Sequence, residues 1–264
     1  MIRNVSARLE LETAGTTELV LGVAVAAREL LGGEHLEILL DGVPIVPQEL
    51  VDRHGSRLHR FVAGAGRMTI DYGAELAGLA EPAAVDPLDL VVYLRPSRYC
   101  ESDSLTPTAR SEFAGLSGTE LLRAVGDWVH DRLRYVPGSS RVTDGAVGTL
   151  LAREGVCRDY AHLVIALLRA IDVPARMAAV YAPGLSPMDF HAVAEAYVDG
   201  AWQVVDATGL APRQSLVRIS TGRDAADTAF LSNHWADLSL RELQVTAVVD
   251  EFRLDDGRAP VALR

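Results

Sequence analysis

The stretch FHAVAEAYVDGAWQVVD, residues 190–206, contains the pattern that decides the fold. Apolar and polar residues alternate on both sides of Asp199-Gly200, a dipeptide typical of the two-residue turn of a β-hairpin. A turn of that length makes Val198 face Ala201 and extends the pairing outward along both strands. The stretch therefore predicts two antiparallel strands that are neighbours in one sheet.

The same register places two chemically active side chains on one face of the predicted sheet. Residues two apart in a strand share a face, so His191 points the same way as Val193, and Asp206 lies opposite Val193. His191 and Asp206 are then diagonal neighbours whose side chains can form a hydrogen bond. Tyr197 and Trp202 form an aromatic pair on that face. A one-residue slip of the turn would separate His191 from Asp206.

Helical patterns precede the hairpin. Ser117-Gly-Thr-Glu120 matches a capping box, and apolar residues at helical spacing follow it. A short helix is predicted after Asp144, and a longer one begins near Cys157 with an apolar stripe that ends before Pro174. Because helices come first and an antiparallel sheet follows, the sequence predicts an α+β class. The strands predicted for this part are 175–181, 190–198 and 201–206.

The N-terminal part of the chain alternates with period two. Glycine-rich turn signals separate its alternating stretches, 5–11, 36–40 and 68–72. A small β-sandwich domain is therefore predicted at residues 1–92, although AAREL within 25–31 favours a helix. The remaining residues, 93–264, are predicted to form the second domain.

Composition and charge narrow the class of protein. The chain has 264 residues, of which 49% are hydrophobic and 23% charged, as in globular proteins. Its formal net charge of −11 argues against nucleic acid and an anionic membrane as partners. The first residues lack the apolar segment of a secretory signal, and the apolar run at 19–27 is too short to span a bilayer. Two cysteines provide no disulfide framework, so we expect a cytoplasmic protein with a reduced thiol.

Cys157 has the position expected of a nucleophile. It follows Gly155 at the predicted start of a helix, where free backbone N–H groups and the helix dipole stabilise negative charge. Cys157 is therefore a candidate nucleophile, and His191 and Asp206 are the candidates for its base and for the residue that orients the histidine. A backbone N–H just after the nucleophile is expected to contribute to an oxyanion hole, whose second donor the sequence does not assign.

These strings carry a family resemblance. GVCRDYAHL (155–163) and DFHAVAEAYVDGAWQVVDATGLAP (189–212) resemble the core of bacterial transglutaminase-like proteins, many of which are described as candidate cysteine proteases. The resemblance extends to YLRPSRYCESD (93–103) and TGRDAADTAF (221–230), and the N-terminal β region is similar to the domain that precedes such cores. It implies a papain-like core of helices packed on an antiparallel sheet, in which Cys157, His191 and Asp206 come together as a Cys-His-Asp triad. Many members have an aromatic residue where this chain has Ala192, which implies a more open substrate groove.

The resemblance implies a cysteine-dependent enzyme that acts on amide bonds through a thioester and needs no cofactor. Hydrolysis of a peptide or protein substrate is the expected reaction, because water needs no second binding site. The alternatives are transfer to an amine, as in a transglutaminase, and a non-catalytic module that binds a peptide or protein. Cys100 can equally be a packed core residue. The candidates for binding substrate are Tyr99, Cys100, Arg158 and Trp202.

Several polar residues outside the predicted triad are expected to stabilise the fold and not to take part in the reaction. The chain lacks paired ligand spacings such as C-x-x-C, so no metal site is predicted. His162 lies five residues after Cys157, off the helix face of the nucleophile, and is expected in the core. His234 is expected in a surface loop or at the edge of the groove. A solvated or salt-bridged loop is predicted at Arg223, Asp224 and Asp227, and the alternative is that these residues shape the substrate entrance.

Overall fold

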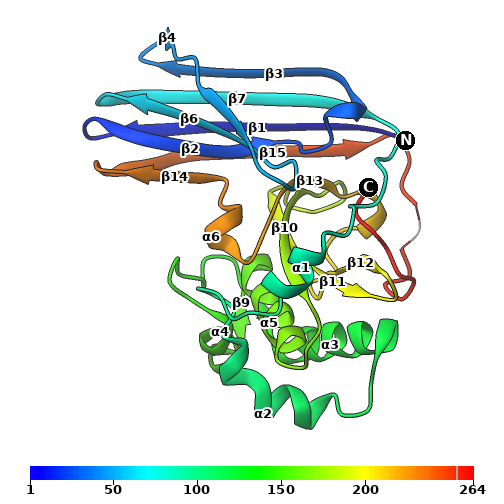
Figure 1. Cartoon of the computed structure of the whole chain (residues 1–264). Coiled ribbons are helices and arrows are strands. Elements are labelled where there is room, and N and C mark those ends of the chain that lie inside the picture. Colours follow the sequence, from blue (N-terminus) through cyan, green and yellow to red (C-terminus); the bar gives the residue numbers. More distant parts are fainter. Residues whose placement is uncertain (254) are drawn as a thin grey trace.

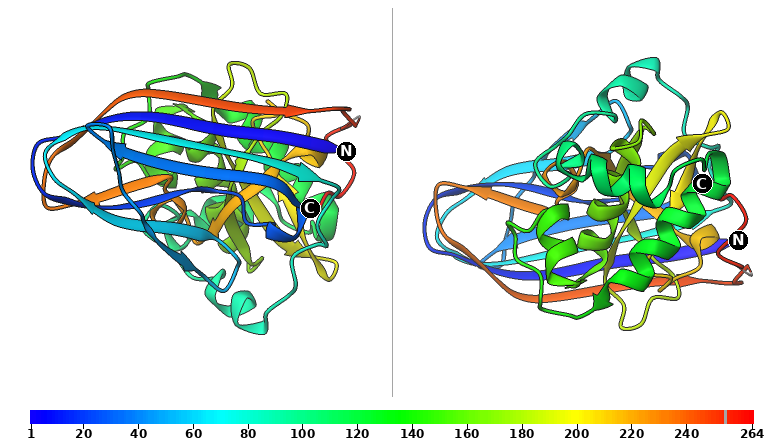
Figure 2. Two further views of the ribbon diagram at one scale, coloured as in Figure 1. Left: turned by 90° about the horizontal axis from the view of Figure 1, so that it is seen from above. Right: turned by 90° about the horizontal axis from the view of Figure 1, so that it is seen from below.

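A computed structural model describes residues 1–253 and 255–264, and it stacks a β-sandwich on a core of helices and sheet (Figure 1). The views in Figure 2 show the long sandwich strands on one side of the molecule and the helices on the other. The architecture is α+β, with a sandwich and with helices packed on an antiparallel sheet. The fold class predicted from the sequence is confirmed.

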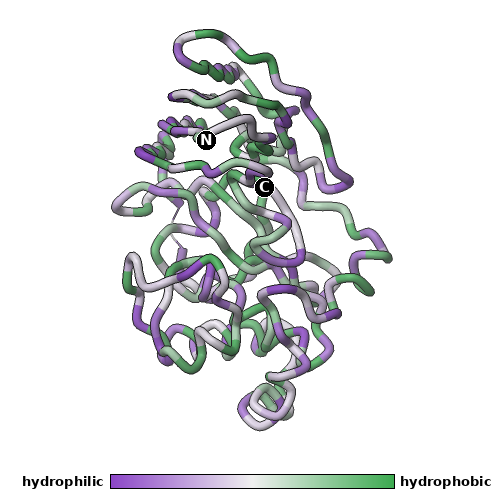
Figure 3. Tube along the Cα trace, turned by 90° about the vertical axis from the view of Figure 1, so that its left-hand side faces the viewer, coloured by the Kyte–Doolittle hydropathy of each residue, from purple (hydrophilic) through white to green (hydrophobic). Residues whose placement is uncertain are grey.

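Alternating apolar residues build the sandwich, because every second side chain of a strand points between its sheets. Its strands are β1 (Ile2–Thr13), β2 (Thr17–Ala24), β3 (Leu31–Leu40), β4 (Val43–Pro44), β5 (Gln48–Val51), β6 (Arg57–Ala63), β7 (Gly66–Ala77), β14 (Leu231–His234) and β15 (Leu238–Val249). One sheet has the order β15-β1-β7-β3-β4, and the other has the order β14-β2-β6-β5. In β1, Val5, Ala7 and Leu9 are buried between the sheets. Figure 3 shows this alternation of hydrophobic and hydrophilic residues along the strands.

The C-terminal part of the chain completes the sandwich. β14 pairs with β2, and β15 pairs with β1 along almost its whole length. The predicted sandwich at 1–92 therefore omits strands, since residues 231–249 return to it from the predicted second domain at 93–264. Without them the backbone groups at those edges of β1 and β2 would be unpaired. Within 25–31 the structure has a single short 3₁₀ turn, η1 (Arg28–Leu30), among the described residues.

The core places helix α5 against an antiparallel sheet of order β12-β11-β10-β13. These strands are β10 (Ala175–Tyr181), β11 (Phe190–Val198), β12 (Ala201–Val205) and β13 (Val217–Gly222). The helices are α1 (Pro87–Val92), α2 (Ser102–Glu112), α3 (Gly118–Arg132), α4 (Ala146–Ala152), α5 (Cys157–Arg169), α6 (Ala225–Thr228) and the 3₁₀ turn η2 (Arg213–Ser215). A short parallel pair precedes α5, β8 (Arg134–Tyr135) and β9 (Glu154–Gly155). In the part of the chain that the structure describes, no helix is long and apolar enough to cross a membrane.

The predicted hairpin is present with the predicted register. Tyr197 pairs with Trp202 across β11 and β12. Asp199 and Gly200 have φ angles of 52° and 82°, as the two central residues of a type I′ turn require. β12 ends at Val205, one residue before the predicted end.

Helix α3 begins where the sequence predicts, but without its expected cap. Ser117 occupies the N-cap position, yet its side chain makes no capping hydrogen bond to the described residues. The next residue, Gly118, has a φ of 58°, so the backbone enters the helix through a left-handed residue instead. The pattern therefore located the helix correctly while the predicted capping box is not formed.

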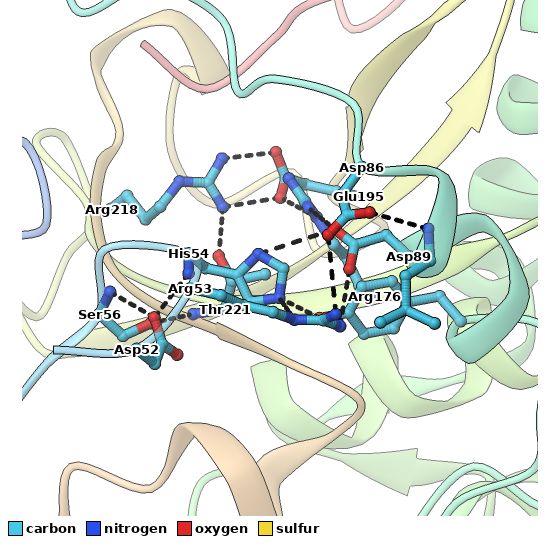
Figure 4. Close-up of polar contacts among 12 residues, drawn as sticks. Asp52, Arg53, His54, Ser56, Asp86, Asp89, Arg176, Glu195, Arg218 and Thr221 are labelled. Atoms are coloured by element: carbon cyan, nitrogen blue, oxygen red, sulfur yellow. Dashed lines mark hydrogen bonds and ion pairs between the residues drawn. The ribbon is translucent and has the colours of Figure 1, made fainter.

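A largely buried network of charged residues joins the sandwich to the core (Figure 4). Glu195 of β11 lies 2.9 Å from Arg176 of β10 and 2.7 Å from Arg218 of β13. Arg176 lies 3.5 Å from Asp89 of α1, which pairs at 2.7 Å with Arg53 in the loop between β5 and β6. Burial acts to raise the pKa of Glu195, but the two arginines lower it to about 2. Glu195 is therefore ionised, and the network crosses from the sandwich to the sheet that carries His191.

Candidate active site

His191 and Asp206 form the hydrogen bond that the hairpin register predicts. Nε2 of His191 lies 2.8 Å from Oδ2 of Asp206, and their side chains are 0% and 2% exposed. Oδ1 of Asp206 accepts hydrogen bonds from the backbone N–H and the hydroxyl of Thr208, at 2.9 and 2.7 Å. Because both carboxylate oxygens are held, the ring of His191 has a fixed orientation.

Asp206 keeps the imidazole in its charged form. Burial acts to lower the pKa of His191, but the Asp206 carboxylate and the Cys157 thiol raise it to about 10. Burial likewise acts to raise the pKa of Asp206, while His191 and the hydrogen bonds from Thr208 lower it. At neutral pH the pair is therefore an imidazolium and a carboxylate.

Cys157 is the first residue of α5. The first backbone N–H groups of a helix have no hydrogen-bond partner within the helix. Oδ2 of Asp159 accepts the Val156 N–H at 2.8 Å and so closes the first turn of the helix. Gly155 permits this turn, since a Cβ at that position would lie 2.7 Å from Cβ of Asp159. The string G-V-C-R-D therefore fixes the backbone around a half-buried cysteine.

Nδ1, the second ring nitrogen of His191, is available to interact with Cys157. The thiol acts on the imidazole through a hydrogen bond and through its charge, and both raise the pKa of His191. Nδ1 of His191 is buried and has no hydrogen-bond partner of ordinary geometry among the described residues. Since Nε2 is bonded to Asp206, Nδ1 is the atom that can exchange a proton with the sulfur. The structure thus brings the three predicted catalytic residues together.

Tyr135 is a neighbour of this site that the sequence did not indicate. It lies opposite Gly155 in the β8–β9 register, and its ring centre is 6.0 Å from that of Tyr160 in α5. Burial and the Cys157 thiol raise the pKa of Tyr135 to about 12, although a hydrogen bond from the Cys157 backbone N–H acts to lower it. Tyr135 comes from a two-residue strand, which is too short for any periodic pattern to reveal it.

Two of the predicted substrate-binding residues are enclosed in the fold. Cys100 is completely buried in the core, and burial raises the pKa of its thiol to about 12. Trp202 is also buried, with the Arg176 guanidinium 4.0 Å from its ring centre. Neither side chain presents a surface to a substrate, which corrects that expectation. For Cys100 the alternative interpretation as a packed core residue describes its position.

Tyr99 and Arg158 hold the loop that precedes α4. The ring of Tyr99 stacks on His162 at 5.1 Å, and its hydroxyl donates to the backbone oxygen of Val142 at 2.8 Å. Arg158, the residue after the cysteine, donates to the backbone oxygen of Arg141 at 2.5 Å. Both side chains therefore fix one loop beside the first turns of α5. A part in substrate binding remains a prediction for these two residues.

The remaining polar residues that the sequence singled out lie away from Cys157, His191 and Asp206 or contact other parts of the fold. His162 is buried and accepts the Ala225 N–H at 3.1 Å, and burial lowers its pKa to about 3. Arg223 and Asp227 form the predicted salt bridge at 2.8 Å, but Asp227 lies in the short helix α6 and not in a loop. His234 is exposed on β14 of the sandwich. Across residues 1–253 and 255–264, no group of three or more His, Cys, Asp or Glu residues could hold a metal ion.

Comparison with known proteins identifies the family. The transglutaminase-like superfamily matches residues 109–207, a range that includes Cys157, His191 and Asp206. A crystal structure of a candidate cysteine protease from Cytophaga hutchinsonii is 31% identical, covers 97% of this chain and 92% of that chain, and superposes with a TM-score of 0.87. The chain belongs to the transglutaminase-like superfamily.

Mycobacterial relatives are similar over shorter stretches. An uncharacterised protein of Mycobacterium leprae is 26% identical over 188 residues, which are 67% of this chain and 65% of that protein. An uncharacterised protein of Mycobacterium tuberculosis is 45% identical over 51 residues, 19% of this chain and 16% of that protein. The chain therefore spans less than two thirds of the length of these curated relatives.

Proposed function

We propose that the protein is a cysteine-dependent enzyme that hydrolyses amide bonds of peptides or proteins. Cys157 is the nucleophile, His191 is the base and later the acid, and Asp206 orients the imidazole. The observation that carries this proposal is the buried His191–Asp206 ion pair, whose remaining ring nitrogen is left for Cys157. The likeness to a candidate cysteine protease from Cytophaga hutchinsonii supports the same assignment.

The reaction begins when the Cys157 thiolate attacks the carbonyl carbon of the amide. A C–S bond forms and the π electron pair of the carbonyl moves to its oxygen. As that pair returns, the C–N bond breaks and Nδ1 of His191 gives its proton to the leaving amine. Water then gives a proton to His191 and attacks the thioester, which releases the carboxylic acid and the cysteine. Asp206 stabilises the imidazolium at each stage, and the scheme needs no cofactor.

Hydrolysis and transfer differ only in the group that attacks the thioester. We favour water because an amine acceptor would need a binding site of its own. The test incubates the protein with a glutamine-containing peptide and a labelled primary amine, with Cys157→Ala as control. We expect release of a carboxylic acid by the unaltered protein and no release by Cys157→Ala. Incorporation of label without formation of acid would contradict hydrolysis, and full biological function of Cys157→Ala would favour a binding module.

We also propose that the protein works in the cytoplasm. Cys100 and Cys157 are free thiols, and the nucleophile must stay reduced to react. Fractionation of cells that produce the protein, with detection by antibody, tests this location. Recovery of the protein outside the cytoplasmic fraction would contradict it.

A further inference from the structure

The proposed reaction needs a donor that the triad does not supply. In the tetrahedral intermediate the former carbonyl oxygen carries negative charge, and donors at about 2.7–3.1 Å from that oxygen stabilise it. The backbone N–H of Cys157, at the start of α5, is one such donor. A second donor has to lie beside this N–H and has to keep its proton at neutral pH.

The pairing of β8 with β9 positions Tyr135 beside the start of α5, where Cys157 lies. The register sets Tyr135 opposite Gly155, two residues before Cys157, and the Val136 N–H donates to the Gly155 oxygen at 3.0 Å. The ring also lies against Tyr160 in the first turns of α5, with 6.0 Å between ring centres. Tyr135 is 40% exposed as a residue, so a substrate can reach it.

The hydroxyl of Tyr135 lies among the reacting groups. Its oxygen accepts a hydrogen bond from the Cys157 backbone N–H, and the charges of Cys157, Asp189 and Asp206 act on it. Burial, followed by the Cys157 charge, raises the pKa of Tyr135 to about 12, so the phenol is protonated at neutral pH. Because its oxygen accepts from the amide, the phenolic proton is free to bond another acceptor.

We propose that the Tyr135 hydroxyl is the second hydrogen-bond donor to the oxyanion, beside the backbone N–H of Cys157. This assignment rests on the proposed function. In the free protein the N–H and the hydroxyl are bonded to each other. The carbonyl oxygen of a substrate enters between them and receives one hydrogen bond from each. The phenol keeps its proton throughout, so no bond to it forms or breaks.

Two reagents that attack the same sulfur separate this role from thiolate formation. Iodoacetamide reacts at a saturated carbon, so a C–S bond forms, iodide leaves and no oxyanion arises. p-Nitrophenyl acetate reacts at a carbonyl carbon, passes through an oxyanion and releases p-nitrophenolate as the thioester forms. Tyr135→Phe keeps the ring and its contact with Tyr160 but removes the hydroxyl. We expect this variant to acylate roughly 10²-fold more slowly and to alkylate at an unchanged rate.

Tyr160→Phe is the matched control, since it removes the hydroxyl of the neighbouring ring, and we expect it to change neither rate. Unchanged acylation in Tyr135→Phe would overturn the assignment. Equal changes in the acylation and alkylation rates of Tyr135→Phe would overturn the assignment as well. Such changes would show that Tyr135 shields or positions the sulfur of Cys157. Normal alkylation with no acylation in the unaltered protein would also contradict it. Absence of alkylation in the unaltered protein would contradict the proposed function itself, which keeps the two failures apart.

Discussion

Oδ2 of Asp206 lies 2.8 Å from Nε2 of His191, at the open end of the hairpin whose turn is Asp199-Gly200. The register of the hairpin therefore sets the distance between the base and the residue that orients it. The same bond leaves Nδ1 of His191 for the cysteine at the start of α5. The proposed arrangement thus depends on the pairing of β11 with β12 and on the position of α5.

Asp206→Asn should slow the reaction of Cys157. The amide is similar in shape to the carboxylate but has no charge to stabilise the imidazolium, so His191 should be a weaker base toward Cys157. We expect the rate of alkylation by iodoacetamide to fall by roughly 10²-fold. Thr208→Val is the control, because it removes one hydrogen bond to Oδ1 and leaves the His191 bond in place. Equal rates in Asp206→Asn and the unaltered protein would show that the carboxylate does not activate the site.

The stability contributed by His191 should decline as the pH rises. Its pKa is raised to about 10 in the folded protein, against about 6.5 in an unfolded chain. The contribution is therefore complete below about pH 6.5 and is lost as the pH rises through about 10. Urea unfolding of the unaltered protein and of His191→Gln at several pH values measures this difference. A difference in the free energy of unfolding that is constant from pH 6 to roughly pH 10.5 would contradict the ion pair.

Glu195→Gln should destabilise the fold strongly. The variant leaves the buried guanidinium of Arg176 and the partly buried guanidinium of Arg218 without their shared carboxylate. We expect a loss of about 3–5 kcal/mol in the free energy of unfolding. The control is Glu12→Gln, which breaks the exposed pair with Arg241 and should cost at most about 1 kcal/mol. Similar small losses in both variants would show that the shared carboxylate of the network in Figure 4 does not stabilise the core sheet.

Gly155→Ala should damage the start of α5. The added Cβ would lie 2.7 Å from Cβ of Asp159, so the Asp159 bond to the Val156 N–H would have to shift. We expect a loss of about 1–3 kcal/mol in the free energy of unfolding, measured in urea. Gly148→Ala is the control, since a Cβ there meets nothing within 4 Å and the residue is exposed in α4, so it should stabilise by up to about 1 kcal/mol. An unchanged free energy of unfolding in Gly155→Ala would contradict the close approach of Asp159 to residue 155.

Local patterns were sufficient for the centre of the site. Asp199-Gly200 determines a turn, the turn determines the register, and the register brings His191 to Asp206 without information from the rest of the chain. The start of α5 at Cys157 was also predictable, because a helix start has a local pattern. The proximity of Cys157 to His191 was not a local property, and the family resemblance supplied it.

Long-range packing explains what the sequence did not reveal. β15 pairs with β1 from the far end of the chain, so no neighbouring pattern indicates that it belongs to the sandwich. Trp202 was correctly paired with Tyr197, yet the pairing could not show that Arg176 from another strand covers its ring. Tyr135 reaches the nucleophile through a two-residue parallel pair, a contact that no periodicity encodes.

Alkylation of Cys157 by iodoacetamide at about pH 6–7, followed by mass spectrometry, tests the activation of the thiol most directly. Cys100, which is buried, serves as the internal control in the same molecule. The proposed mechanism predicts rapid modification of Cys157, no modification of Cys100, and a much slower reaction of Cys157 in His191→Ala. An unreactive Cys157, or a rate that is the same in His191→Ala, would contradict the activation of Cys157 by His191.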